Sequence, residues 1–189
     1  MTADLIARAQ KIKLVLFDVD GVMTDGTLFL ADDGQEYKGF HSLDGHGLKM
    51  LKGTGVELGI ITGRSSRVVE HRARSLGIEI LHQGAHDKLA VYESLCRDLN
   101  IACDTTAYMG DDVLDLPVLR RVGFAACPSD AHEAVRERVH YVCDRPGGRG
   151  AVREFVDLWL ELHGKREAVA ERFWNGPGIA GSEVAGGEE

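Results

Sequence analysis

Residues 14–26, LVLFDVDGVMTDG, decide the fold class of this chain. Four apolar β-formers open the segment, which then turns polar at Asp18, Asp20 and Gly21. A short apolar run that ends at polar residues and glycine is typical of a strand buried on both faces. Because open α/β sheets bind ligands at the carboxyl ends of their strands, we expect Asp18 and Asp20 at the lip of a cleft.

The two aspartates are separated by a single residue, so their charges lie close together. Like charges this near disfavour joint ionisation unless a cation compensates them. Carboxylate oxygens are hard ligands that suit Mg2+. Asp18 and Asp20 therefore predict a metal-assisted reaction on a phosphate group, with a solvated turn as the alternative if they stood alone.

Strand-like and helix-like segments alternate along the rest of the chain. Apolar runs predict strands over residues 14–17, 56–62, 78–81, 105–109, 123–127 and 141–142. Apolar periodicity and stop signals predict helices over 43–54, 65–76, 86–99, 113–122, 131–139 and 151–163. This repeated βα order predicts an α/β fold, a Rossmann-like parallel sheet with helices on both faces.

The length of 189 residues suits one domain, which we place over residues 1–165. A small β-hairpin is expected at about 27–40, since two strand-like runs flank Asp33-Gly34, a typical hairpin turn pair. Residues 166–189 form a C-terminal extension. Beyond Trp174 the extension is glycine-rich and acidic, which predicts partial disorder.

Composition excludes several classes of partner. The formal net charge of −8 argues against nucleic-acid binding, which favours basic patches. No segment approaches the roughly 20 apolar residues of a membrane span, and the first residues lack the features of a signal peptide. The four cysteines form no Cys-x-x-Cys pair, which is typical of reduced thiols. We expect a cytoplasmic protein that binds neither membranes nor nucleic acid.

Further polar motifs follow other predicted strands. Thr62-Gly63-Arg64 precedes a helix whose N-cap is expected at Ser65, and a hydroxyl with N–H groups at a helix start can cradle a phosphate. Lys88 lies near the start of its helix, where a cation could hold a phosphate and balance the aspartates. Each motif alone would more often be an ordinary turn or a surface charge.

A second acidic cluster follows the predicted strand at 105–109. Gly110 precedes Asp111 and Asp112, and Asp115 lies one helical turn beyond. These acids can complete the coordination of a cation and support the loop through hydrogen bonds. Residues 147–150, GGRG, either bind an anion or form a turn before the last predicted helix of the domain.

Taken in order, DVDGVMT, ITGR, a downstream lysine and GDDVLD resemble the haloacid dehalogenase superfamily of aspartyl phosphotransferases. From about residue 11 to about residue 165, the chain also resembles the 3-deoxy-D-manno-octulosonate 8-phosphate (Kdo 8-phosphate) phosphatases. The segments that carry this resemblance are FHSLDGHGLKMLK, GIITGRSS, RARSLGI, GDDVLDLPVL and GGRGAVREFVDLWL. The resemblance implies a haloacid dehalogenase-like fold with a minimal hairpin cap. It also implies a magnesium-dependent phosphatase that releases Kdo for bacterial lipopolysaccharide synthesis.

The resemblance also implies roles for the residues of the first motif. Asp18 would attack phosphorus and form an aspartyl-phosphate. Asp20 would protonate the leaving oxygen and later deprotonate the attacking water. Magnesium would bind a carboxylate oxygen of Asp18, the main-chain carbonyl of Asp20 and the carboxylate of Asp111.

The remaining motifs would hold the substrate or support the loops. Thr62, Gly63 and Lys88 would bind the transferring phosphate, and Arg64 would bind the carboxylate of the sugar acid. Three supporting residues complete the predicted site: Thr24 would fix the loop and the position of Asp20, Asp112 would act through water or by orienting Lys88, and Asp115 would support the loop.

Assembly and three other functions follow as hypotheses. The hairpin is too small to cover an eight-carbon sugar, and the family resemblance implies a homotetramer whose neighbouring subunits complete the pocket. One alternative function is a phosphatase of a nine-carbon, sialic-acid-like keto-sugar acid 9-phosphate. The others are a phospho-accepting signalling module and a non-catalytic structural subunit, both disfavoured by the complete set of acidic motifs and lysine.

Overall fold

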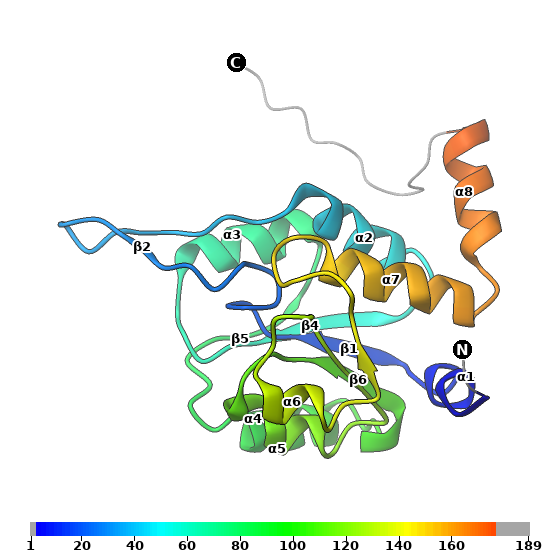
Figure 1. Ribbon diagram of the computed structural model, residues 1–189, viewed down its shortest axis with the longest axis horizontal. Helices are drawn as coiled ribbons and strands as arrows, with labels where there is room; N and C mark the ends of the chain where they lie inside the picture. The colour runs from blue at the N-terminus through cyan, green and yellow to red at the C-terminus, as the bar shows by residue number, and fades with distance from the viewer. Residues whose placement is uncertain (1–2, 177–189) are drawn as a thin grey trace.

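A six-stranded sheet forms the centre of the molecule in the computed structural model, which describes residues 3–176 (Figure 1). Its strands are β1 (Leu14–Phe17), β4 (Glu57–Ile61), β5 (Ile80–His82), β6 (Thr106–Met109), β7 (Phe124–Cys127) and β8 (Tyr141–Val142). They lie in the order β5-β4-β1-β6-β7-β8, and every neighbouring pair is parallel. β1 therefore lies between β4 and β6, so the residues that follow these three strands meet at one edge.

Helices cover both faces of the sheet, as Figure 1 shows. One face carries α1 (Ala3–Ala9), α2 (Ser42–Lys52), α3 (Arg67–Leu76) and α7 (Ala151–Leu162). The other face carries α4 (Lys88–Asp98), α5 (Leu116–Leu119) and α6 (Glu133–Arg136). The predicted α/β fold with a parallel sheet is confirmed. Within residues 3–176, no helix has the length and hydropathy needed to cross a membrane.

The two cores explain why β1 is continuously apolar. Val15 and Phe17 point into the core under α7, whereas Leu14 and Leu16 point into the core under α4. Side chains alternate between the faces of a strand, so a strand buried on both faces needs an apolar residue at every position. The Phe155 ring of α7 packs edge-on against Phe17, with ring centroids 6.0 Å apart.

The predicted hairpin is present as a separate two-stranded sheet. β2 (Phe29–Leu30) pairs antiparallel with β3 (Glu36–Tyr37), and Gly34 adopts a φ of 81° in the connecting turn. In Figure 1 the hairpin extends away from the body of the molecule. Four apolar side chains on it are exposed, those of Leu28, Phe29, Leu30 and Tyr37.

Several predicted helix boundaries are wrong. The helix expected from residue 65 begins at Arg67, and Ser66, rather than Ser65, occupies the N-cap position. The Ser66 N–H is bound by the Gln83 Oε1 atom at 2.8 Å, a partner that local sequence does not reveal. The helix expected over 113–122 divides into a 3-10 turn, η2 (Val113–Asp115), and the short α5.

Other differences lie in short or terminal segments. The helix expected over 131–139 is reduced to α6, and a 3-10 turn, η1 (Cys103–Thr105), precedes β6. Helix α1 was not predicted. It packs against α7 and β7, so long-range contacts stabilise a segment too short to be helical by itself.

The division between a domain over residues 1–165 and a C-terminal extension remains a prediction. The extension begins with a helix, α8 (Arg166–Asn175), which packs on α7 and places the Phe173 ring 5.1 Å from that of His46. The partial disorder predicted beyond Trp174 concerns mainly residues 177–189, which lie outside the described residues.

Phe155→Ala is expected to lower the free energy of unfolding by about 3–5 kcal/mol, because it leaves a cavity among packed aromatic rings. The ring contacts Phe17 and Phe124 at centroid distances of 6.0 and 5.9 Å. Urea denaturation measures the change. Phe173→Ala, at a 37% exposed position, is the control and should cost much less. A loss below about 1 kcal/mol for Phe155→Ala would contradict the assigned core.

Candidate active site

A cavity of about 280 Å³ opens at the carboxyl ends of β1, β4 and β6. Its lining consists of Asp18, Asp20, Gly21, Gly26, Thr62, Gly63, Arg64, Lys88, Asp111, Asp112, Leu114 and Asp115. Every predicted site residue except Thr24 therefore lies on this one cavity. The strand order explains the convergence, because parallel neighbours end at the same edge of the sheet.

Thr24 does not line the cavity but stabilises the loop after β1. Its side chain is 2% exposed, its Oγ1 donates to the Val19 carbonyl at 3.4 Å, and it accepts from the Gly26 N–H at 3.2 Å. The Thr24 N–H also donates to the Val19 carbonyl, at 3.0 Å. These bonds close the loop that carries Asp20.

Lys88 connects two carboxylates inside the cavity. As the first residue of α4, it follows Asp87, whose side chain caps the helix by accepting from the Ala90 N–H at 3.0 Å. The Lys88 Nζ atom donates to Asp18 Oδ2 at 2.6 Å and to Asp115 Oδ1 at 2.7 Å. Burial opposes the charge of Lys88, but the two carboxylates outweigh it and raise its pKa.

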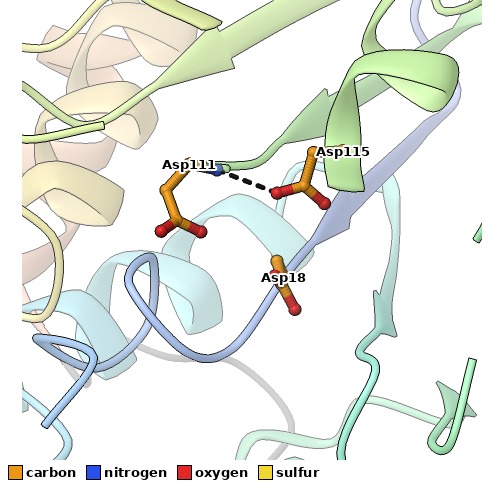
Figure 2. A group of neighbouring side chains, drawn as sticks. All are labelled: Asp18, Asp111 and Asp115. Carbon is orange, nitrogen blue, oxygen red and sulfur yellow. Dashed lines mark hydrogen bonds between the residues drawn. The ribbon is translucent and has the colours of Figure 1, made fainter. Parts of the chain in front are cut away.

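Asp115 is fully buried and organises the loop after β6. Its Oδ1 also accepts from the Tyr108 hydroxyl at 2.7 Å. Its Oδ2 accepts from the Asp111 N–H at 3.0 Å, the hydrogen bond drawn in Figure 2, and from the Asp112 N–H at 3.2 Å. Of the two roles considered for Asp112, the orientation of Lys88 is provided by Asp115 instead. Asp112 instead accepts from the Val113 N–H at 2.7 Å.

Glycine allows the loops around the cavity to approach each other. Gly21 has a φ of 84°, and a Cβ atom there would lie 2.0 Å from Asp111 Oδ2. A Cβ atom at Gly147 would lie 1.8 Å from the Gly21 carbonyl oxygen, and the Gly148 N–H donates to the Val22 carbonyl at 2.9 Å. Of the two roles considered for residues 147–150, the structure favours the turn, which supports the Asp18 loop from behind.

The carboxylates of Asp18, Asp111 and Asp115 are close enough to share a cation, since one oxygen from each lies within 4.8 Å of the others (Figure 2). Asp111 Oδ1 is buried and has no hydrogen-bond partner within residues 3–176. Each oxygen of Asp115 already accepts two hydrogen bonds, whereas each oxygen of Asp18 accepts one and Asp111 Oδ1 accepts none, so Asp111 and Asp18 are the more available ligands. Three acids with oxygen donors and one unpartnered buried oxygen fit a hard divalent cation such as Mg2+.

The electrostatics of the cluster agree with this fit. Burial, followed by repulsion from Asp115, raises the pKa of Asp18 from an ordinary 3.8 to about 6. Burial and the charges of Asp115 and Asp18 raise the pKa of Asp111 to about 8. Lys88 opposes both shifts but does not cancel them, so the cluster holds more negative charge than one lysine compensates.

Thr62, Gly63 and Arg64 line the opposite side of the cavity, after β4. The Thr62 N–H donates to the His82 carbonyl at 2.9 Å, and its own carbonyl accepts from the Ala85 N–H at 3.0 Å. The Arg64 guanidinium turns toward the hairpin, where it donates to Glu36 Oε2 at 3.2 Å. Its Nε lies 3.9 Å from Asp20 Oδ2.

Sequence reasoning missed three polar residues beside this site. Tyr108 reaches Asp115 from within β6, a strand that looks merely apolar in sequence. Glu36 and Lys38 approach from the hairpin, and Lys38 forms ion pairs with both Asp20 and Glu36. Their alternation around Tyr37 puts both charges on one face of the strand, a signal that could have directed attention to the cleft.

Comparison with known proteins agrees with this geometry. The chain matches the family of haloacid dehalogenase-like hydrolases over residues 77–155. It is 43% identical over 165 residues to the 3-deoxy-D-manno-octulosonate 8-phosphate phosphatase KdsC of Escherichia coli, which covers 87% of this chain and 88% of that protein.

Two solved structures share the fold closely. One is a probable yrbi family phosphatase from Pseudomonas syringae, with a TM-score of 0.90, 47% identity, and coverage of 93% of this chain and 100% of that one. The other is the 3-deoxy-D-manno-octulosonate 8-phosphate phosphatase of Moraxella catarrhalis in complex with magnesium, phosphate and Kdo. Its TM-score is 0.89 at 39% identity, over 92% of this chain and 99% of that one.

The parallel sheet and the aspartate-rich cavity with its buried lysine define a haloacid dehalogenase-like hydrolase. The likeness to KdsC extends over most of both chains and is more specific. The chain belongs to the family of 3-deoxy-D-manno-octulosonate 8-phosphate phosphatases.

The raised pKa values predict how pH affects the metal-free protein. A carboxyl group whose pKa is higher in the folded than in the unfolded protein stabilises the fold at a pH below its unfolded pKa, which is near 3.8. This stabilisation is lost as the pH rises through the folded pKa values, about 6 for Asp18 and about 8 for Asp111. Without metal, the unfolding temperature should therefore fall across this window. Stabilisation by added Mg2+ should grow over the same window, since binding requires deprotonated ligands.

Thermal unfolding in EDTA or MgCl2, followed from about pH 4 to pH 8, measures both trends. Asp111→Asn removes one titrating carboxylate and is the matched control, so it should flatten the pH dependence and reduce the effect of Mg2+. An Mg2+ effect that is constant with pH, or unchanged in Asp111→Asn, would contradict this account of the cluster.

Proposed function

We propose that the protein is a Mg2+-dependent phosphatase that hydrolyses Kdo 8-phosphate to Kdo and inorganic phosphate, a step in bacterial lipopolysaccharide synthesis. The observation that carries this proposal is the buried Asp18 carboxylate, which faces a cavity between Lys88 and the unpartnered oxygen of Asp111. Support comes from relatives named for this activity, one of them solved with magnesium, phosphate and Kdo.

Asp18 acts as the nucleophile. The Val19 N–H donates to its Oδ1 at 2.7 Å, and Lys88 donates to its Oδ2 at 2.6 Å, so the carboxylate is held in one orientation. A carboxylate oxygen attacks phosphorus, the bond to the sugar oxygen breaks, and an aspartyl-phosphate forms. Water then hydrolyses this intermediate, which divides one difficult step into two easier ones.

Asp20 transfers the protons. It lies two residues after the nucleophile and lines the same cavity. It donates a proton to the leaving sugar oxygen in the first step. In the second it accepts a proton from the attacking water, which returns it to its starting state.

The phosphate is held by groups from two further loops. The Thr62 hydroxyl and the Gly63 N–H bind nonbridging oxygens, and Lys88 neutralises part of their charge. Magnesium, held by Asp18, Asp111 and the main-chain carbonyl of Asp20, supplies further charge neutralisation when it is bound. Asp115 supports this arrangement by holding Lys88 and the loop of Asp111.

Arg64 is proposed to bind the carboxylate of the sugar acid. Its side chain is 45% exposed at the mouth of the cavity, and a guanidinium binds a carboxylate through two parallel hydrogen bonds. A nine-carbon acid 9-phosphate would need the same cation farther from the phosphate. The named relatives favour the eight-carbon substrate.

Phosphate release from Kdo 8-phosphate, a nine-carbon keto-sugar acid 9-phosphate and a hexose 6-phosphate tests the function, each with and without Mg2+. We expect kcat/KM to be highest for the eight-carbon acid, with activity lost in EDTA and in Asp18→Asn. Arg64→Met should narrow the difference between the sugar acids and the hexose phosphate by about 1–2 orders of magnitude, as it removes a charged hydrogen bond. Equal rates on all three substrates would reject the assigned specificity.

We also propose a homotetramer in which neighbouring subunits complete the active site. The hairpin exposes Leu28, Phe29, Leu30 and Tyr37, which is an unusual concentration of apolar side chains on so small an element. A hairpin of this size cannot cover a sugar acid by itself. A second copy packed against these side chains would bury them and narrow the cavity mouth.

Light scattering of Phe29→Ser/Leu30→Ser tests the assembly. The wild-type chain should have about four times the monomer mass of 20.6 kDa, and the variant should dissociate and lose activity. Leu99→Ser removes an exposed leucine from the end of α4 and should keep both the mass and the activity. A wild-type mass near that of one chain would exclude the tetramer.

The proposed location is the cytoplasm. All four cysteines have free thiols, and three of them are buried in the cores. Free thiols are typical of reducing compartments, where disulfides seldom persist.

A further inference from the structure

Lys38 is a buried cation on an otherwise exposed hairpin. Its side chain is 1% exposed, whereas the neighbouring Tyr37 is 59% exposed. The Lys38 Nζ atom donates to Asp20 Oδ1 and lies 2.6 Å from Glu36 Oε1. Lysine is seldom buried without charged partners, so these contacts define its environment.

The position of Lys38 follows from the pleat of the hairpin strand. Glu36 and Lys38 alternate with Tyr37 and therefore point to the same face, toward the cavity. Phe40 anchors the end of this strand by packing against the core, and the Arg72 guanidinium lies 5.4 Å from its ring centroid. The base of the hairpin is thus tied to the domain.

Arg64 and Glu36 extend the contact into a network of four charges. Arg64 donates to Glu36 Oε2 at 3.2 Å and approaches Asp20 Oδ2 at 3.9 Å. The contacts with Lys38 and Arg64 hold the pKa of Glu36 below its ordinary value, so Glu36 stays ionised. Anions and cations alternate along the network, which favours one arrangement of the side chains.

Asp20 depends on this network for its orientation. Within residues 3–176, Lys38 is the only residue that donates a hydrogen bond to the Asp20 carboxylate. The Asp20 side chain is 22% exposed and lies on a loop, and its other charged neighbour, Arg64, approaches no closer than 3.9 Å. A proton donor contributes fully only when it is held within hydrogen-bond reach of the leaving oxygen.

We infer that Lys38 is a positioning residue, which holds the Asp20 carboxylate toward the leaving oxygen of the substrate through the ion pair observed at the hairpin base. This inference rests on the proposed function, since it takes Asp20 to be the proton donor. Lys38 does not line the cavity, so direct binding of the substrate is not its role. The hairpin therefore belongs to the proton-transfer machinery as well as to the cap.

Two simple aryl phosphates test the inference without any contribution from the sugar. Phenyl phosphate has a poor leaving group that needs a proton, whereas 4-nitrophenyl phosphate has a good one that needs little help. In Lys38→Met we expect kcat/KM to fall about tenfold or more for phenyl phosphate and less than about twofold for 4-nitrophenyl phosphate. The parameter kcat/KM is used because it reports the step in which the leaving group departs.

Three variants make the comparison specific. Asp20→Asn should show the same selective loss of kcat/KM with a larger magnitude, about 100-fold or more for phenyl phosphate. Lys38→Arg retains a cation and should recover part of the activity. Lys52→Met alters a lysine on α2 that contacts the Gly77 carbonyl, away from the cavity, and should leave both rates unchanged.

The outcomes separate the inference from the proposed function. If Asp20→Asn affects both substrates equally, the acid role of Asp20 fails. If Asp20→Asn is selective but Lys38→Met affects both substrates equally, or neither, only the positioning role fails. If Lys38→Met does not fold, the double variant Lys38→Met/Glu36→Gln replaces it, because it also removes the Glu36 charge that Lys38→Met leaves without its lysine partner. The double variant should show the same selective loss of kcat/KM for phenyl phosphate.

A crystal structure of Lys38→Met supplies a readout independent of turnover. We expect the Asp20 carboxylate to leave its position at the cavity or to occupy several rotamers, while Asp18, Lys88 and Asp115 keep their contacts. An Asp20 side chain that stays in place, with full occupancy, would overturn the inference even if activity changed.

Discussion

Compensation of buried negative charge is the constraint on which the rest of this structure depends. Asp18, Asp111 and Asp115 lie together at the edge of the sheet, and Lys88 is hydrogen-bonded to two of them. Burial raises the pKa values of Asp18 and Asp111, and repulsion between acids that one lysine does not balance raises them further. The same excess of negative charge makes the site suited to a divalent cation and to a phosphate that the cation accompanies.

The backbone is built to bring these charges together. Three parallel strands end side by side, and glycines let the loops that follow them approach within contact distance of side chains and carbonyls. Asp115 then satisfies two N–H groups of its own loop while holding Lys88, so it joins the folding of the loop to the placement of the cation. In this site the hydrogen bonds that stabilise the fold also position Lys88 and the Asp111 loop.

The hairpin contributes to the site from its exposed side, through the contact of Lys38 with Asp20. Its outer side chains are large, apolar and exposed in a single chain, whereas Glu36 and Lys38 turn inward to charged partners near the cavity. If the outer surface is covered by a second subunit, as proposed, assembly and proton transfer share one element. Such an arrangement explains how a very small cap could serve a site that has little other cover.

By itself, the sequence determined the α/β class and the strand that carries Asp18, because buried strands are continuously apolar. It also determined most of the residues that line the cavity, because motifs at the ends of parallel strands converge. Tertiary structure alone decided that Asp115, rather than Asp112, binds Lys88, that α3 begins at Arg67, and that Lys38 reaches Asp20. These details depend on partners many residues away in the chain. Side-chain direction and long-range contact set them, and neither has a local signature in the order of residues.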